Sequence, residues 1–284
     1  MKRVRRGFTL IEVSLFLAIT ALIFVGVVVG TQNSIFQQRY NDSVQGFVDF
    51  LRNTYSQTIN IKSEGFGRSN YAIYGKLVTF NEQDGSNNIR AYNVIGKIDN
   101  EGLDCAGGML NKLVCLDANV VLKKNINGEQ KYETVGFMEE YVPRWASQIQ
   151  TVNGWNDGYE IFKGSLLIVR SPETGTMYTY VMEKEIDVET IIENGNSSDL
   201  NVFDYYSGGE KKNYLKNRDF SIKEVNFCVN PNGAEKSSLR RNIRIEKGTI
   251  NASGIEIVSD GENIVEERRG SEVVEVDKGN KCEP

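Results

Sequence analysis

The chain has 284 residues, of which 40% are hydrophobic, so it is long enough to bury a substantial core. Its formal net charge of −5 argues against general binding to nucleic acids or to anionic membrane surfaces. The absence of histidine excludes Ser-His-Asp and Cys-His catalysis and removes the commonest zinc ligand.

The amino-terminal segment combines a basic leader with a long apolar run. The leader, residues 1–7, ends at Gly7 and contains four basic residues: Lys2, Arg3, Arg5 and Arg6. The run that follows, residues 8–30, contains a single charge, Glu12. As a helix it would extend roughly 35 Å, enough to cross a hydrocarbon core of about 30 Å. The sequence therefore predicts a transmembrane helix over residues 8–30, with the leader in the cytoplasm and the rest of the chain outside.

The junction between the leader and the apolar run reads Gly7-Phe8-Thr9-Leu10-Ile11-Glu12-Val13. This motif resembles the processing site of type IV prepilins and type II secretion pseudopilins. The resemblance implies that a prepilin peptidase cuts between Gly7 and Phe8 and that the new amino terminus is methylated. It also implies that Glu12, the fifth residue of the mature chain, meets the free amine of Phe8 in a neighbouring filament subunit.

Two simpler kinds of targeting segment are the alternatives to a prepilin leader. An ordinary signal anchor could carry an incidental acid near the membrane interface. A cleaved secretory signal would have an apolar region of about 7–15 residues and an A-x-A-like site, whereas this run is longer and lacks such a site. The retained acid favours the prepilin interpretation, because a carboxylate in a membrane helix costs a few kcal/mol and normally has a partner.

The helical pattern continues beyond the apolar run. Apolar and aromatic residues recur at three- and four-residue steps, at Phe36, Tyr40, Val44, Phe47, Leu51, Tyr55 and Ile59. This spacing predicts an amphipathic segment, residues 31–60, with one face against a sheet. We therefore expect one long helix over residues 8–60, about 80 Å in length. The alternative is a separate surface helix after a break at Gly30, since a glycine weakens a helix by up to about 1 kcal/mol.

The remainder of the chain, residues 61–284, is rich in strand patterns and is expected to form an extracytoplasmic globular domain. The predicted strands are Tyr71–Phe80, Ile89–Ile98, Leu113–Lys123, Gln130–Phe137, Ile161–Val169, Thr176–Met182, Ser221–Val229, Asn242–Glu246, Gly254–Val258, Asn263–Arg268 and Glu272–Asp277. We interpret residues 138–159 as a short helix or an irregular insertion. Its tryptophans, Trp145 and Trp155, could form a contact surface, but packing is the simpler interpretation. The expected fold is α+β, with a long amino-terminal helix packed on an antiparallel sheet, similar to pilins but with extra β elements.

The four cysteines all lie in the part of the chain that is expected to be exported: Cys105, Cys115, Cys228 and Cys282. An even number in an exported domain predicts disulfides. Of the three possible pairings we favour Cys105–Cys115, which is local, with Cys228–Cys282, which would tie down the carboxyl-terminal tail. Free buried thiols are the alternative, and the absence of a C-x-x-C motif argues against a zinc ribbon.

A short basic stretch lies in the last quarter of the chain. Its candidate contacts to DNA are Arg240, Arg241, Arg244 and Lys247. A strand edge with solvated charges is the simpler interpretation, because Glu246 and Glu256 lie close by and the chain is acidic. No segment has the spacing of an EF-hand, and we predict no metal site.

These patterns predict a structural protein: a minor pilin-like subunit that a prepilin peptidase processes and that assembles into a type IV pilus or related filament. The expected partners are other pilin subunits through the amino-terminal helix, the peptidase, the inner-membrane assembly platform and, before assembly, the membrane. Alternatives are a type II secretion pseudopilin or an adhesive or DNA-binding tip module. Carboxylates are plentiful, but no pattern singles out a catalytic pair, so we predict neither an enzyme nor a cofactor.

Overall fold

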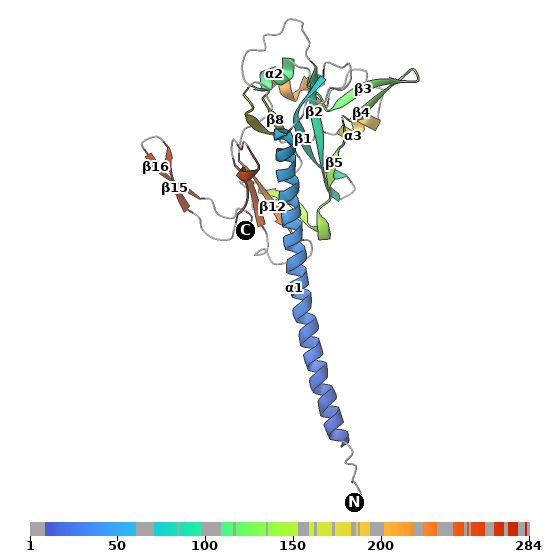
Figure 1. The fold of residues 1–284 in the computed structure, drawn as a ribbon, viewed down its shortest axis with the longest axis vertical. Coiled ribbons are helices and arrows are strands. Elements are labelled where there is room, and N and C mark those ends of the chain that lie inside the picture. Colours follow the sequence, from blue (N-terminus) through green and yellow to red (C-terminus); the bar gives the residue numbers. More distant parts are fainter. Residues whose placement is uncertain are drawn as a thin grey trace, which may run out of the picture.

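The structure is a computed structural model in which one long helix extends from a β-rich body (Figure 1). It describes residues 9–60, 71–83, 86–97, 109–115, 118–134, 136–152, 159–161, 164–171, 174–182, 186, 188–193, 202–217, 224–231, 241–246, 249, 251–258, 264–269, 272–277 and 282. The first turns of the helix lie at its far end, well away from the body.

The long helix, α1 (Leu10–Ile59), has 50 residues and ends where the N–H of Asn60 donates to the carbonyl of Ser56, at 3.1 Å. It continues through Gly26 and Gly30, so the predicted single helix is confirmed over these residues and the alternative break at Gly30 is wrong. No proline interrupts α1, and each missing side chain costs a helix only about 1 kcal/mol. Packing of the second half against the body stabilises the helix beyond that cost.

The first sheet has five antiparallel strands in the order β5-β2-β1-β8-β9. Its strands are β1 (Tyr71–Gln83), β2 (Ser86–Lys97), β5 (Glu139–Tyr141), β8 (Ser165–Arg170) and β9 (Met177–Met182). Side chains of β8 are buried on both faces, because α1 covers one face and the short elements α2 and α4 cover the other. The predicted strands Ile161–Val169 and Thr176–Met182 correspond to β8 and β9, which pair with each other, except that Ile161 lies in a strand of the second sheet.

The second sheet also has five antiparallel strands, in the order β14-β13-β12-β6-β7. Its strands are β6 (Gln148–Val152), β7 (Tyr159–Ile161), β12 (Val225–Asn230), β13 (Arg241–Ile245) and β14 (Ile255–Val258). One apolar face of this sheet packs against α1 and the first sheet. The expectation of one sheet is therefore corrected to two, both of which contact the same helix.

The remaining elements are short. They are α2 (Met109–Cys115), the hairpin of β3 (Val121–Ile126) and β4 (Glu129–Thr134), the 3-10 helix η1 (Arg144–Ala146), α3 (Val188–Glu193), the hairpin of β10 (Asp204–Ser207) and β11 (Glu210–Asn213), α4 (Tyr214–Asn217), the 3-10 helix η3 (Ala252–Gly254), and the hairpin of β15 (Ile264–Arg269) and β16 (Glu272–Asp277). The strand expected over Leu113–Lys123 is wrong at its start, since residues 109–115 are helical and α2 packs over the first sheet. Its end is confirmed, since Val121–Lys123 lie in β3. Residues 138–159 contain strands β5 and β6 as well as η1, so their interpretation as an irregular insertion is also corrected.

Three phenylalanines mark the point where α1 meets both sheets. The ring of Phe47 on α1 lies 6.4 Å from that of Phe80 on β1 and 5.6 Å from that of Phe227 on β12, edge to face in both cases. Phe80 and Phe227 stack on each other at 5.2 Å. The amphipathic half of α1 is therefore the common core element of the two sheets.

Candidate functional site

The amino-terminal end of α1 is closed by a reciprocal pair of side-chain contacts. Thr9 is the N-cap, and its hydroxyl accepts a hydrogen bond from the backbone N–H of Glu12 at 3.3 Å. The carboxylate of Glu12 in turn accepts from the backbone N–H of Thr9, at 2.9 Å, and from its hydroxyl, at 3.0 Å. This is a capping box, which satisfies backbone donors that the first turn of a helix leaves free.

The capping box gives Glu12 a role within a single chain. A threonine followed three residues later by a glutamate, before an apolar run, is the sequence signal for this motif. That signal is present at Thr9 and Glu12, but the isolated charge is the more conspicuous feature, and the cap was not predicted. Gly7 and Phe8, the residues of the expected processing site, lie outside the described residues.

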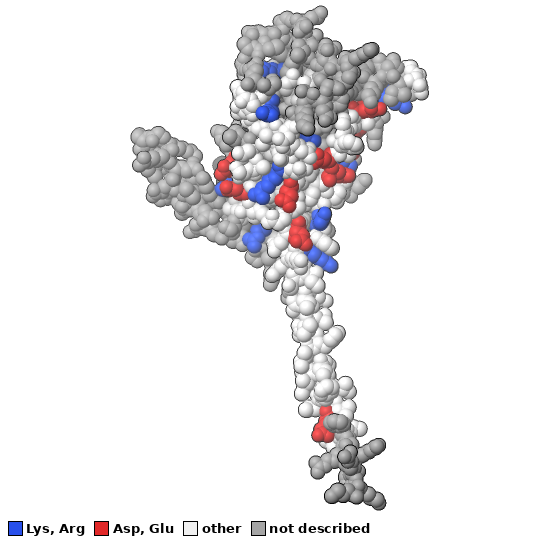
Figure 2. Space-filling model, in the orientation of Figure 1, with Lys and Arg blue, Asp and Glu red and all other residues white. Residues whose placement is uncertain are grey.

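The first half of α1 presents its apolar side chains to the outside on every face. They include Leu10, which is 86% exposed, and aliphatic and aromatic residues in every turn up to Val29. This helix is long and apolar enough to span a membrane. Figure 2 shows an uncharged surface along the helix between the base of the body and the carboxylate near its far end.

The few hydroxyls in this exposed half are satisfied within the helix itself. Thr20 donates to the carbonyl of Phe16 at 3.0 Å, and Thr31 donates to that of Val27 at 2.9 Å. Ser14 donates to the carbonyl of Ile11 at 2.9 Å. Groups bonded in this way need no water, and the surface is therefore compatible with a hydrocarbon environment.

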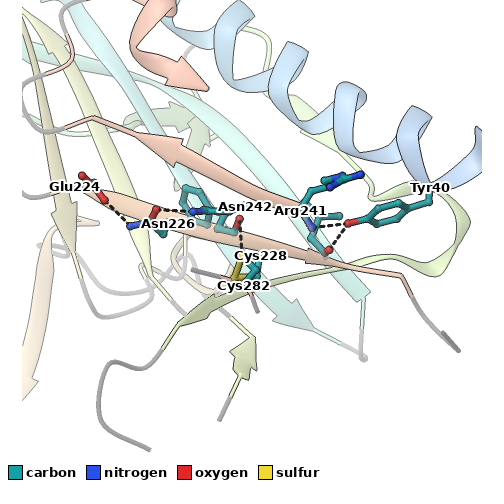
Figure 3. The surroundings of a disulfide bond; sticks show 9 residues. Tyr40, Glu224, Asn226, Cys228, Arg241, Asn242 and Cys282 are labelled. Carbon is teal, nitrogen blue, oxygen red and sulfur yellow. Dashed lines mark hydrogen bonds between the residues drawn. A yellow bond between two sulfur atoms is a disulfide. The ribbon is translucent and has the colours of Figure 1, made fainter. Parts of the chain in front are cut away.

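Tyr40 is the first fully packed residue of α1 and anchors the helix to the second sheet. Its hydroxyl donates to the carbonyl of Val229 at 2.7 Å and accepts from the N–H of Arg241 at 2.8 Å (Figure 3). Farther along, the guanidinium of Arg52 donates to the carbonyl of Ile255 at 2.9 Å. These contacts join α1 to strands β12, β13 and β14.

Tyr55 joins the same helix to the first sheet. Its side chain is buried, and its hydroxyl lies 2.6 Å from that of Thr179 on β9. Burial raises the pKa of Tyr55 well above the ordinary value of a phenol, and the hydrogen bond to Thr179 lowers it by less. The predicted stripe is thus confirmed from Tyr40 to Tyr55, whereas Phe36 stays exposed.

The structure joins Cys228 on β12 to Cys282 in a disulfide, which confirms the long-range pair predicted from the sequence (Figure 3). Both cysteines are fully buried, on the face of the second sheet that points away from α1. Cys105 lies outside the described residues, as does the side chain of Cys115, so the local pair stays a prediction. A disulfide of this kind persists in an oxidising compartment outside the cytoplasm.

The basic candidates divide into two groups. Arg240 and Lys247 lie outside the described residues. Arg241 lies on β13 and offers its backbone N–H to Tyr40. Arg244 is buried on the same strand, and its guanidinium forms an ion pair with Glu256 at 2.8 Å. Arg244 is thus engaged inside the body, which leaves its charge unavailable to a phosphate in this arrangement.

Among the described residues, no cluster of three or more cysteine, aspartate and glutamate side chains has the arrangement of a metal site. Comparison of the chain with protein-family models, with curated proteins and with solved structures found no match. The uncovered half of α1, with Thr9 and Glu12 at its start and Tyr40 at its entry into the body, is therefore the candidate functional site on structural grounds alone.

Proposed function

We propose that this chain is a membrane-anchored structural subunit of an extracellular filament, either a minor pilin of a type IV pilus or a secretion pseudopilin. The observation that carries the proposal is the continuity of α1. The apolar half is long enough to cross a bilayer and is exposed on all faces, and it forms one continuous helix with the half that packs in the core of the body. The helix therefore attaches the body to a membrane or to a filament.

The proposed mechanism is assembly and not catalysis. Apolar side chains of the exposed half leave the lipid and pack against the same half of neighbouring subunits, as parallel helices do in a bundle. A prepilin peptidase removes residues 1–7, and the amine of Phe8 becomes available to the carboxylate of Glu12 in an adjacent subunit. An acid in an apolar helix is costly, and this contact compensates its charge once the filament excludes water.

Glu12 has two separable properties in this proposal, its negative charge and its place in the capping box with Thr9. Glu12→Gln removes the charge and keeps an acceptor that fits a capping box. Thr9→Ala removes the capping hydroxyl, at a cost of about 1 kcal/mol, and keeps the charge. The two variants therefore distinguish an intermolecular role of the charge from a purely local role at the helix start.

The test compares the amount of each variant in filaments sheared from the producing cells with its amount in the membrane, by quantitative mass spectrometry. We expect Glu12→Gln to reduce incorporation at least about tenfold, equivalent to about 1.4 kcal/mol. Thr9→Ala should keep most of it. Glu210→Gln, a change of an exposed acid on β11, is the matched control.

Three outcomes would contradict the proposal. The first is normal incorporation of Glu12→Gln into filaments, which would show that the charge is not required. The second is an equal loss of incorporation in Thr9→Ala, which would show that the capping box, and not the charge, is required. The third is an intact mass of the membrane-bound wild-type chain that still includes residues 1–7. The expected mature chain begins at Phe8, and Gly7→Ala should slow its production.

A further inference from the structure

A short loop at the base of the body, residues 142–146, lies beside α1 where the helix leaves the body. We name it the basal loop; it connects β5 with β6 and includes η1. Val142 and Trp145 are each 54% exposed, and Arg144 is also exposed. The expectation that Trp145 has a packing role is therefore wrong for most of its surface.

The basal loop is held to one turn of α1 at both of its ends. On one side the hydroxyl of Tyr141 donates to the carbonyl of Ser43 at 3.0 Å, and on the other side the hydroxyl of Ser147 pairs with that of Ser43. The ring of Tyr141 also stacks on Phe50, with 5.5 Å between the ring centroids. These contacts fix the height of the loop along the helix.

Trp145 has a strained backbone, and about half of its side chain is exposed. Trp145 has φ 59° and ψ 33°, a left-handed conformation that costs a bulky residue of order 1–3 kcal/mol. The guanidinium of Arg39, on α1, lies 4.4 Å from the centre of the ring. The strained turn thus builds an exposed pair of one aromatic ring and one cation, which attract each other.

The position of this pair can be compared with that of a membrane that α1 spans. Arg39 is the first charged residue after Glu12, and all residues between them are uncharged. If Glu12 lies at the inner boundary, a hydrocarbon core of about 30 Å ends about 20 residues later, near residue 33. Arg39 then lies about 9 Å beyond the outer boundary, and its side chain, like others on a helix, leans back toward the amino terminus.

We propose that the basal loop and Arg39 form an anchor in the phospholipid headgroup layer of the outer leaflet. The ring of Trp145 lies among the headgroups, and the guanidinium groups of Arg39 and Arg144 pair with lipid phosphates. Two observations support lipid as the occupant: the exposed side chains of Val142 and Trp145 lie beside α1 where it leaves the body, and the cations of Arg39 and Arg144 complement phosphate. Tryptophan is enriched in this layer, and a long arginine side chain can extend its charged group into it. The acidic residue of α1 nearest to Arg39 is Asp42, which is exposed and lies about one helical turn farther from the membrane.

This inference depends on the membrane anchoring in the proposed function and adds to it. A helix that is apolar on all faces can slide and tilt in a bilayer, whereas an interfacial tryptophan and arginine fix its depth. The anchor would hold the body upright on the membrane until assembly, with Glu12 at a constant depth near the opposite surface. Assembly then has to release the headgroup contacts of Trp145.

The test uses the full chain with Trp155→Phe, so that Trp145 is the only tryptophan, in vesicles of phosphatidylcholine and phosphatidylglycerol. We expect a blue shift of its emission on reconstitution, and quenching by lipids brominated close to the headgroup that exceeds quenching by lipids brominated deep in the chain. Arg39→Gln and Arg144→Gln should reduce both effects, and vesicles of phosphatidylcholine alone should give weaker quenching.

A second tryptophan position separates this inference from the membrane anchoring itself. In the background Trp145→Phe and Trp155→Phe, Phe24→Trp should be quenched by the deeply brominated lipids. If Phe24→Trp is quenched and Trp145 is not, the inference is overturned and the anchoring stands. If neither position is quenched, both fail. A blue shift of Trp145 that depends on protein concentration and not on lipid would assign the basal loop to a second copy of the chain, which also overturns the inference.

Discussion

At the scale of single residues, Tyr40 determines where α1 stops being an exposed rod and becomes a core element. Its hydroxyl lies between the carbonyl of Val229 and the N–H of Arg241, on neighbouring strands of the second sheet. A buried donor or acceptor that loses its partner costs about 1–3 kcal/mol. These two hydrogen bonds therefore help to hold α1 in its position against the second sheet.

We predict that Tyr40→Phe lowers the free energy of unfolding of the body by about 1–2 kcal/mol, because two backbone groups lose a hydrogen-bonding partner while the ring volume is kept. The measurement is urea unfolding of the full chain in detergent micelles. Tyr178→Phe is the matched control, since Tyr178 is half-buried and its hydroxyl forms no hydrogen bond among the described residues. Equal stability of Tyr40→Phe and wild type would contradict the prediction.

Glu12 shows how far a single residue can be interpreted from sequence. Its isolation in an apolar run is visible in the sequence and draws attention to its charge. The capping box with Thr9 follows from the same residues but from a different rule, the spacing of three between an N-cap and its partner. In the proposed function the charge acts between subunits, whereas the capping box acts within one helix. Variants that change only one of the two properties are therefore needed to measure each contribution.

At the scale of elements, Gly75 lies in a close approach between β1 and β8. A Cβ at this position would lie 2.0 Å from the carbonyl oxygen of Ile168 and 2.7 Å from the Cα of Val169. The register of β1 against β2 also shifts between Ile73 and Gly75, which marks a bulge. Only glycine fits here, because the atoms that a side chain would meet belong to the backbone of the adjacent strand.

We predict that Gly75→Ala destabilises the body by about 3 kcal/mol or more, because β1 and β8 would have to separate at the centre of the first sheet. Gly46→Ala is the control on α1, where the added Cβ would make an ordinary contact with the ring of Tyr141, at 3.5 Å. It should be neutral or stabilising by up to about 1 kcal/mol, owing to helix propensity. Thermal unfolding followed by circular dichroism measures both, and equal melting temperatures would contradict the assignment of the close approach.

At the scale of the whole molecule, α1 and the Cys228–Cys282 disulfide tie together parts that are distant in sequence. The first half of the chain provides the helix and most of the first sheet, and the second half provides β12, β13 and β14. The disulfide spans 54 residues and attaches the end of the chain to β12. By the chain-entropy estimate, closing a loop of this length stabilises the native state by about 4 kcal/mol.

We predict that the double variant Cys228→Ser, Cys282→Ser lowers the melting temperature of the body by on the order of 10 °C, as expected for a loss of about 4 kcal/mol in a domain of this size. Reducing agent should lower the melting temperature of the wild-type chain by a similar amount. A chain with Cys105→Ser and Cys115→Ser should keep its sensitivity to reductant. If that sensitivity is lost instead, the stabilising disulfide involves the other cysteines, and the assignment is wrong.

The sequence alone determined the elements that depend on local order. The periodicity of apolar residues and the lack of proline predict the helix over residues 8–60, and the structure confirms it from Leu10 to Ile59. Asn-Gly is a turn-forming dipeptide, and Asn127-Gly128 likewise lies where the chain reverses between β3 and β4. Helices and tight turns depend on interactions between residues only a few positions apart, and these residues can be identified from the sequence alone.

Tertiary structure decided the features that depend on distant partners. The division into two sheets, the place of β5 beside β2, and the exposure of Trp145 follow from contacts between residues far apart in the chain. Residues 113–115 were expected to begin a strand but form the end of α2, whose side chains pack over the first sheet. Strand pairing and burial are set by which surfaces meet, and a local pattern of residues does not contain that information.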